Sequence, residues 1–243
     1  MRILGVIPAR YSSSRLPGKP LADICGKPMI WWVYNQAIKV PDREVIVATD
    51  DQRIVDACKT MDIPCMLTGQ HGTHVERIFE VSTKIDADYY ISINGDEPLI
   101  DPDTIVKVFP KEAAEECYVG GLMRPMDEPT EVIDPGNIKV VVDSEGFCLF
   151  LSRSPIPFPY KTILYKYYKL VGVECYNKFA LKFMHDTPPS TIEKIEDVTL
   201  LRFIEHHLPV KYTLVDSFSL SVDTQRDLEK VRSIISERQS VKQ

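Results

Sequence analysis

The sequence predicts an α/β fold: one domain, spanning residues 1–243, built on a single doubly wound mixed sheet with a smaller β-rich insertion. Over the first 110 residues, short apolar runs alternate with segments of helical periodicity, which is the pattern of βαβ units. In the second half, proline and glycine interrupt the apolar runs more often, which favours antiparallel or mixed strands. The 243 residues are 44% hydrophobic and 26% charged, a composition that supports a substantial core.

The first half opens with a buried strand, Arg2 to Pro8, that leads into a polar, basic loop. Pro28 favours the first turn of a helix, because proline has no amide hydrogen to leave unpaired there. Asp50 or Asp51 is expected to cap the next helix by accepting a bond from an exposed amide. The predicted strands are 2–8, 44–49, 65–68 and 89–94, and the predicted helices are 29–38, 51–61, 73–85 and 102–109.

The second half is predicted to contain shorter strands separated by turns. Asp143 to Gly146 lies between two apolar runs and indicates a hairpin, since glycine supplies the positive φ of a tight turn. A charged amphipathic helix closes the chain. The predicted strands are 118–123, 138–142, 147–152, 171–176 and 212–215, and the predicted helices are 178–185, 197–207 and 224–237.

Charge and cysteine content exclude several classes of protein. A net charge of −6 argues against a general affinity for nucleic acid or anionic membranes, so an anionic ligand needs a local basic site. No apolar run approaches the roughly 20 residues of a membrane span, and the first residues do not form a signal peptide, so we expect a cytoplasmic protein. The six cysteines lack zinc spacing and are expected to be small, buried, reduced residues.

The loops that follow Pro8, Thr49 and Asn94 are expected to share one rim of the sheet, because ligands of open α/β sheets bind beyond the carboxyl ends of the strands. The first of these loops carries three cations among serines and a glycine, a set that can neutralise and hydrogen-bond a polyphosphate. Composition alone leaves open an ordinary solvated loop. The three cations are Arg10, Arg15 and Lys19.

A carboxylate follows the fourth strand, in Gly-Asp-Glu-Pro at 95–98. Mg²⁺ prefers one or two carboxylates together with water and substrate phosphates, so Asp96 is a candidate ligand. Asp223 is either the second ligand or the N-cap of the last helix, and spacing leaves both roles open. The first loop has no Gly-x-Gly-x-x-Gly, which excludes a dinucleotide-dependent dehydrogenase.

Four motifs occur together in an order that resembles the 3-deoxy-manno-octulosonate cytidylyltransferases. Further matches at 137–141, 152–153, 156–157 and 227–229 extend the resemblance over nearly the whole chain. The four motifs are Val-Ile-Pro-Ala-Arg-Tyr at 6–11, Arg-Leu-Pro-Gly-Lys-Pro at 15–20, Gly-Asp-Glu-Pro at 95–98 and Val-Asp-Thr at 222–224.

The resemblance implies a sheet of nucleotidyltransferase type and transfer of CMP from CTP to an acidic sugar, with Mg²⁺ as cofactor and pyrophosphate as product. It makes residues 1–110 the nucleotide-binding half and 111–243 the acceptor-binding half, and it favours a homodimer. Arg15, Lys19, Asp96 and Asp223 are then catalytic, with Asp96 and Asp223 as the metal ligands. The implied nucleotide-binding residues are Pro8, Ala9, Arg10, Ser13, Arg77 and Asn94, and the implied acceptor-binding residues are Arg153, Glu174 and Thr199.

The departures from the family pattern lie where substrates are recognised. His74 replaces a glycine of the loop near the base, so we expect CTP to be preferred less exclusively than in the family. Leu170 and Leu200 replace a histidine and a glutamine, and Glu174 replaces a tyrosine. These changes favour an acceptor with fewer hydroxyls and an amine. The acceptor is therefore 3-deoxy-manno-octulosonate, an amino-substituted acidic sugar, or a phosphorylated or phosphonate molecule.

Two other classes stay as alternatives. A glycosyltransferase normally has Asp-x-Asp at its metal loop, which Gly95 to Glu97 lacks, and a non-catalytic nucleotide-binding protein would not need all four catalytic residues. The five histidines need no catalytic role. A run of aromatic residues in the insertion is expected either to meet a twofold partner or to form a loop over the active site. These are Phe158, Tyr160, Tyr165, Tyr167 and Tyr168.

Overall fold

The computed structural model describes residues 1–12, 16–162, 164–216 and 220–240, and it has the predicted mixed α/β architecture. These residues group into two compact units. One unit holds the described residues up to Val106 together with those from 220 to 240, and the other holds those from Lys107 to 216. The second unit is therefore inserted into the chain of the first.

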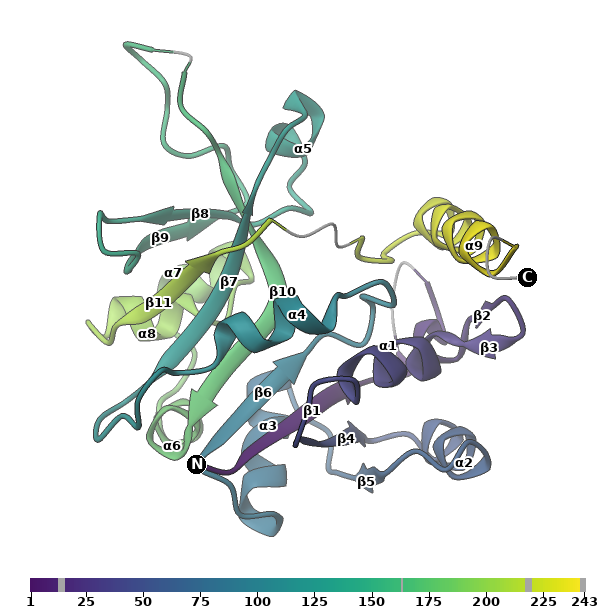
Figure 1. Cartoon of the computed structure of the whole chain (residues 1–243). Helices are drawn as coiled ribbons and strands as arrows, with labels where there is room; N and C mark the ends of the chain where they lie inside the picture. Colours follow the sequence, from purple (N-terminus) through teal and green to yellow (C-terminus); the bar gives the residue numbers. More distant parts are fainter. Residues whose placement is uncertain (13–15, 163, 217–219, 241–243) are drawn as a thin grey trace. The chain divides into compact units, whose positions relative to one another are not determined.

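The sheet of the first unit is parallel, as the βαβ pattern predicts. Its central strand, β1 (Ile3–Ala9), pairs in parallel with β4 (Glu44–Thr49) and β6 (Tyr89–Ile93), and β4 pairs in parallel with β5 (Cys65–Leu67) (Figure 1). Since parallel neighbours end at the same edge, the loops after β1, β4 and β6 meet at one rim.

Two helices of this unit begin directly after a capping residue, and the cap predicted at Asp50 or Asp51 is Asp51. Asp51 caps α2 (Gln52–Thr60) by accepting from the Arg53 amide at 2.9 Å, and Thr73 forms a capping box with Glu76 at the start of α3 (His74–Lys84). Pro28, predicted to lie in a first turn, instead ends a short strand and precedes α1 (Met29–Ala37).

Short elements that the sequence did not indicate surround these helices. They are η1 (Lys19–Leu21), β2 (Asp23–Ile24) and β3 (Lys27–Pro28), while the helix predicted over 102–109 divides into α4 (Pro102–Ile105) and η2 (Val106–Val108). The closing helix predicted over 224–237 is confirmed as α9 (Gln225–Ser240). Of the helices described, no member is both long and apolar enough to cross a membrane.

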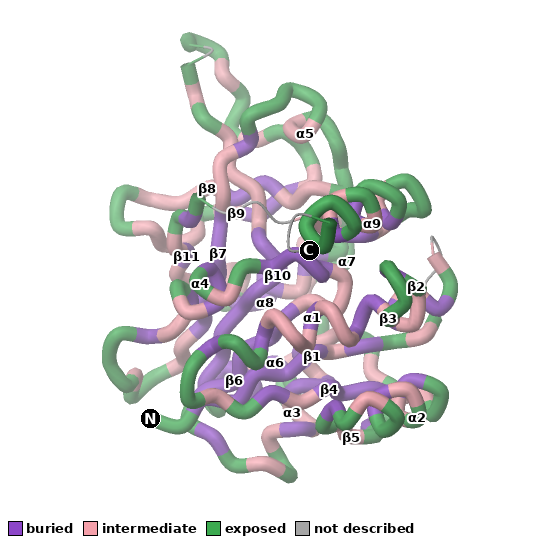
Figure 2. Tube along the Cα trace, turned by 45° about the vertical axis from the view of Figure 1, so that its right-hand side comes forward, coloured by how far each residue is buried: buried purple, intermediate pink, exposed green. Residues whose placement is uncertain are grey.

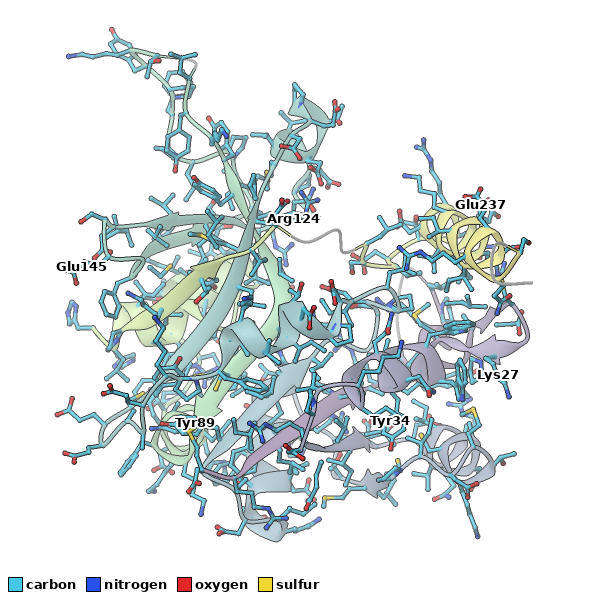
Figure 3. All side chains as sticks on the ribbon, in the orientation of Figure 1. Lys27, Tyr34, Tyr89, Arg124, Glu145 and Glu237 are labelled. Atoms are coloured by element: carbon cyan, nitrogen blue, oxygen red, sulfur yellow. The ribbon has the colours of Figure 1, made fainter. Side chains whose placement is uncertain are left out.

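The core of the first unit lies along β1 and β6, which are buried over most of their length (Figure 2). The C-terminal helix α9 adds a second cluster, in which Leu228, Val231 and Ile235 pack with Ile24 and Met29 from the N-terminal region. The opposite side of α9 is exposed, and Glu237 projects from it (Figure 3). Burial of one apolar stripe therefore attaches the end of the chain to its beginning.

The second unit has the mixed strands that proline and glycine predict. In it, β7 (Val119–Pro125) pairs antiparallel with β10 (Tyr168–Asn177) and parallel with β11 (Val210–Leu214). The predicted hairpin joins β8 (Lys139–Val142) to β9 (Cys148–Ser152), with Gly146 at φ +86°.

Two sequence predictions were wrong, one for a helix of this unit and one for the burial of the cysteines in both units. The helix predicted over 197–207 is only α8 (Leu201–Glu205), because Asp197 takes a left-handed conformation that ends the preceding α7 (Thr191–Glu196), a helix not predicted. Among the six free cysteines, Cys58 and Cys175 are buried, whereas Cys25 is exposed. The other helices of this unit are α5 (Pro129–Ile133) and α6 (Lys178–Asp186).

Candidate functional site

In the loop after β1, a backbone hydrogen bond joins Gly18 to Tyr11. The amide of Gly18 donates to the carbonyl of Tyr11 at 3.0 Å, and Gly18 has φ +70°. A side chain at position 18 would be strained by this φ and would lie 3.1 Å from the Tyr11 ring. Glycine is therefore required for the turn, which starts η1 at Lys19.

The side chain of Lys19 lies between two carboxylates from distant segments. Its Nζ donates to Oδ2 of Asp96 at 2.7 Å and to Oδ1 of Asp223 at 3.1 Å. All three side chains are largely buried, at 16%, 21% and 29% exposure respectively. Three of the four predicted catalytic residues thus meet at one point, while Arg15 lies outside the described residues.

Backbone bonds bring the two aspartates together. Asp96 follows β6, and its carbonyl accepts the Val222 amide at 2.9 Å. The N-cap of α9 is Thr224, whose hydroxyl accepts from the Asp227 amide at 3.3 Å while the Asp227 carboxylate accepts the Thr224 amide at 2.9 Å. Because Thr224 caps the helix, Asp223 is not the cap, and its carboxylate pairs with Lys19 instead.

The electrostatics of this cluster favour a cation between the carboxylates. Burial lowers the pKa of Lys19, but the charges and hydrogen bonds of Asp96 and Asp223 outweigh burial and hold the pKa above its usual value. Lys19 is therefore a fixed positive charge at the rim, a property suited to holding phosphate oxygens.

The donor set also fits a divalent cation of the Mg²⁺ type. Oδ1 of Asp96 is shielded from solvent and has no hydrogen-bond partner among the described residues. A buried carboxylate oxygen without a partner is costly unless a ligand satisfies it. No group of three or more His, Cys, Asp or Glu side chains in the described chain is arranged to hold a metal. Two carboxylates with water and phosphate oxygens are what Mg²⁺ usually takes.

The other predicted nucleotide-binding residues lie at the same rim in part. Pro8 and Ala9 end β1, Arg10 is exposed directly after them, and Asn94 is half-buried after β6. The structure therefore places these four beside the loops that carry Lys19 and Asp96. Ser13 lies outside the described residues.

Arg77 is a buried tie between loops. Its side chain is 5% exposed, its Nη1 donates to the Thr68 hydroxyl at 2.5 Å, and its Nη2 lies 3.2 Å from Oδ1 of Asp50. Arg77 thus joins α3 to the ends of β4 and β5. Asp50 and Thr68 were not predicted as site residues, although each directly follows a strand at the rim, which is a readable signal.

The loop between β5 and α3 is tied to the helix by Glu80. The Glu80 carboxylate accepts the Gly69 amide at 2.8 Å, lies 2.7 Å from Nε2 of His71, and accepts from Lys84 at 2.5 Å. The Lys84 and His71 bonds lower the pKa of Glu80 to about 2. A single carboxylate therefore holds this loop against α3.

Of the predicted acceptor residues, Arg153 is the most extensively bonded. Its guanidinium donates to three carbonyls, those of Glu196 at 2.7 Å, Pro135 at 2.9 Å and Asp197 at 3.1 Å. These bonds fix the end of β9 against α7. Thr199 is half-buried in the turn before α8 and uses its carbonyl to accept the Arg202 amide.

Glu174 belongs to a buried polar cluster in the second unit. It lies opposite Gly121 of β7, which in turn lies opposite Tyr212 of β11, so Glu174 and Tyr212 share one face. A side chain on Gly121 would meet the Tyr212 ring at 2.7 Å. The Tyr176 hydroxyl donates to the Glu174 carboxylate, whereas the Tyr212 hydroxyl, on a side chain that is 3% exposed, has no partner in the described chain. The alternation of strand residues indicates the shared face of Glu174 and Tyr176, but not the cross-strand approach of Tyr212.

Comparison with known proteins assigns the chain to a family. Residues 4–211 match the family described as Cytidylyltransferase. The 3-deoxy-manno-octulosonate cytidylyltransferase of Vibrio cholerae serotype O1 is 39% identical, over 96% of this chain and 97% of that protein. The protein of the same name from Photobacterium profundum is 42% identical, over 95% of this chain and 98% of its own length.

Comparison with solved structures supports the same family and fold. A CMP:2-keto-3-deoxy-manno-octonic acid synthetase complexed with CTP superposes with a TM-score of 0.91 at 37% identity, over 98% of this chain and 100% of that one. The inositol-1-phosphate CTP transferase from T. maritima, at 16% identity and a TM-score of 0.68, shares the fold. Since the sequence likeness spans nearly the full length of both proteins and the motifs meet at one rim, the chain belongs to the 3-deoxy-manno-octulosonate cytidylyltransferase family.

Proposed function

We propose that this protein transfers CMP from CTP to 3-deoxy-manno-octulosonate and releases pyrophosphate. The observation that carries the proposal is the position of Lys19, held at 2.7 Å and 3.1 Å between two carboxylates at the rim where the family's nucleotide loops converge. The named function of relatives that are 39% and 42% identical supports the same reaction.

The proposed reaction is an in-line displacement at phosphorus. An acceptor hydroxyl oxygen forms a bond to the α-phosphorus of CTP, the bond from that phosphorus to the bridging oxygen breaks, and pyrophosphate leaves. Lys19 and Arg15 hold the departing phosphates and offset their growing negative charge, and Arg10 adds a third cation to the same loop. The protein supplies position and charge and needs no covalent nucleophile.

We propose Mg²⁺ as the cofactor, with Asp96 and Asp223 as its protein ligands. The unpartnered Oδ1 of Asp96 and the oxygen-only donor set support this choice. When bound, the ion would supply Lewis-acid stabilisation of the phosphate oxygens. When CTP and the ion bind, the ammonium group of Lys19 would leave Asp96 and Asp223 and bind phosphate oxygens instead.

We propose that Asn94 contacts the nucleotide directly and that Arg77 supports its binding indirectly. Asn94 offers an amide at the rim for direct contact. Arg77 acts indirectly. Its guanidinium already bonds to Thr68 and Asp50, so it supports the nucleotide site by holding these two residues in place. Arg153 and Thr199 are proposed to shape the acceptor site, Arg153 chiefly by ordering the chain between β9 and α7.

A second acceptor is favoured by one observation. Glu174 is 6% exposed and bonded to Tyr176, and the hydroxyl of Tyr212 on the same face lacks a partner among the described residues. A carboxylate beside an unsatisfied hydroxyl is suited to a primary ammonium group, which offers three donors. An amino-substituted acidic sugar is therefore the second candidate acceptor.

Pyrophosphate release with each of four nucleoside triphosphates, against both acceptors and a phosphorylated control, tests these proposals. We expect CTP to be preferred; equal kcat/KM with ATP contradicts a cytidylyltransferase, and no release with any pair favours a non-catalytic protein. If the amino acceptor is used, Glu174→Gln should raise its KM about 10- to 100-fold and leave the KM for 3-deoxy-manno-octulosonate unchanged. Tyr176→Phe is the matched control, because it removes a hydroxyl without removing the charge.

We also propose a cytoplasmic homodimer. The segment between β9 and β10 extends away from the strands of its unit (Figure 1), and its residues Phe158, Tyr160 and Leu164 are 80–86% exposed. Exposed aromatic side chains in one segment are typical of a protein interface. The free cysteines support a reducing compartment, which cell fractionation would test.

A further inference from the structure

Arg53 lies against the nucleotide loop although it belongs to α2. Its guanidinium carbon is 3.3 Å from the centroid of the Tyr11 ring. Two of its nitrogens, Nε and Nη2, donate to the Asp51 carboxylate at 2.9 Å and 2.6 Å. The guanidinium plane is thus fixed by the residue that caps α2, even though the Arg53 side chain is 59% exposed.

The Tyr11 ring has Gly18 on another side. The nearest ring atoms lie 3.1 Å from where a Cβ of Gly18 would be, and the Gly18 amide donates to the Tyr11 carbonyl at 3.0 Å. The residue after Gly18 is Lys19, which reaches Asp96 and Asp223. A continuous chain of contacts therefore runs from Arg53 through Tyr11 and the Gly18 turn to the catalytic lysine.

We propose that Arg53 is a positioning residue for the nucleotide site, acting through Tyr11 to hold the Gly18 turn and Lys19 in place. The proposal rests on the proposed function for its kinetic consequence. Arg53 itself touches neither carboxylate of the site. Its Nε and Nη2 are engaged by Asp51 and its face is used by the ring, so its effect on the nucleotide is exerted through the loop.

The competing interpretation is that Arg53 binds phosphate directly with its charge. The two differ in one respect: a direct contact costs the same whether or not Tyr11 is present, whereas a positioning effect vanishes with the ring. A double-mutant cycle over Arg53→Ala and Tyr11→Leu separates them.

For the cycle, we expect Arg53→Ala to raise the KM for CTP about three- to fivefold, the size of an exposed cation–π contact, with kcat within about twofold of wild type. In the Tyr11→Leu background, Arg53→Ala should add nothing further. Tyr11→Phe should behave as wild type, because the ring is kept, and Arg53→Lys should restore part of the loss. Lys59→Ala, an exposed cation in the last turn of the same helix, is the matched control.

Amide hydrogen exchange gives a readout that needs no substrate. In Arg53→Ala the Gly18 amide should exchange at least about fivefold faster, while amides within β1 are unchanged. Unaltered exchange at Gly18, or an additive double-mutant cycle, overturns the positioning role. If wild-type protein turns over no nucleotide, the proposed function fails while the exchange experiment still decides whether Arg53 holds the loop.

Discussion

At the scale of single residues, Lys19 places its ammonium group between Asp96 and Asp223, the two carboxylates proposed to bind Mg²⁺. It separates two carboxylates that are each more than two-thirds buried. In Lys19→Ala these carboxylates lose their cation, so we expect Mg²⁺ to raise the Tm of this variant more than that of wild type, although turnover falls about 10²- to 10³-fold. Thermal unfolding over a Mg²⁺ series measures this; an equal Mg²⁺ effect on both proteins argues against a metal at this place.

Neutralising either aspartate should have the opposite effect on metal binding. Asp96→Asn or Asp223→Asn should lower turnover at least about a hundredfold while the circular dichroism spectrum is unchanged, because each removes half of the anionic donor set. Pyrophosphate release at several Mg²⁺ concentrations gives the measurement. Asp56→Asn, an exposed aspartate on α2, is the control, and near-normal activity in either site variant contradicts the metal assignment.

We expect substitution of Arg77 to lower the stability of the fold, whereas substitution of Lys19 lowers turnover. Arg77→Met leaves the Asp50 carboxylate and the Thr68 hydroxyl without their shared partner, so we expect the free energy of unfolding to fall by about 1–3 kcal/mol. Urea unfolding of the variant measures the loss. A variant as stable as wild type but slow in turnover would show instead that Arg77 reaches the nucleotide itself.

At the scale of elements, the start of α3 carries a pH-dependent tie. The Glu80 pKa is about 2 in the folded protein, below the usual 4.5, so this carboxylate stabilises the fold fully above about pH 4.5. That contribution is lost as the pH falls from about 4.5 to 2, as Glu80 takes up a proton. The loop at Gly69 and His71 should loosen over the same range.

Glu80→Gln tests this tie. The stability difference between wild type and the variant, measured by urea unfolding, should be largest near neutral pH and should shrink steadily below pH 4.5. Glu229→Gln on α9 is the control, since that residue is exposed. A difference that is constant with pH would mean that the Glu80 charge contributes nothing.

Elements with strong local signals could be predicted from the sequence, and those decided by neighbours could not. The strand 44–49 matches β4 residue for residue, and the capping box at Thr73 marks the start of α3. The left-handed turn at Asp197 has no such signal, since aspartate enters that conformation only when the chain around it demands it. Likewise β2 and β3 are two residues each, too short to show a period.

At the scale of the whole molecule, the exposed aromatic segment sets the expected assembly. Replacing Phe158 and Tyr160 by serine should convert a dimer into a monomer with an unchanged circular dichroism spectrum, because both side chains are exposed and lie outside the core. Sedimentation equilibrium of wild type and the double variant gives the answer. A wild-type monomer would leave the segment as a loop over the active site, the other interpretation of its aromatic content.

The sequence predicted that Lys19, Asp96 and Asp223 belong to the candidate site, but it did not predict the bonds among them. The rule that ligands lie beyond strand ends selected Asp96, and the cations of the first loop selected Lys19. Asp223 was open between metal ligand and N-cap, and the family motifs favoured the ligand. The ion pairs among them depend on the Val222 amide bonding to the Asp96 carbonyl, a contact between segments more than a hundred residues apart. Pattern along a sequence carries no information on such contacts.

Lys19 and Asp223 are 204 positions apart in the sequence, and this separation sets the order in which their cluster can form. During synthesis, at about 5–20 residues per second, roughly 10–40 s pass between the addition of the lysine and of its second carboxylate. For all of that interval Lys19 cannot form its bond with Asp223. The cluster of Lys19, Asp96 and Asp223 can therefore form only after the segment that leads into α9 has been made.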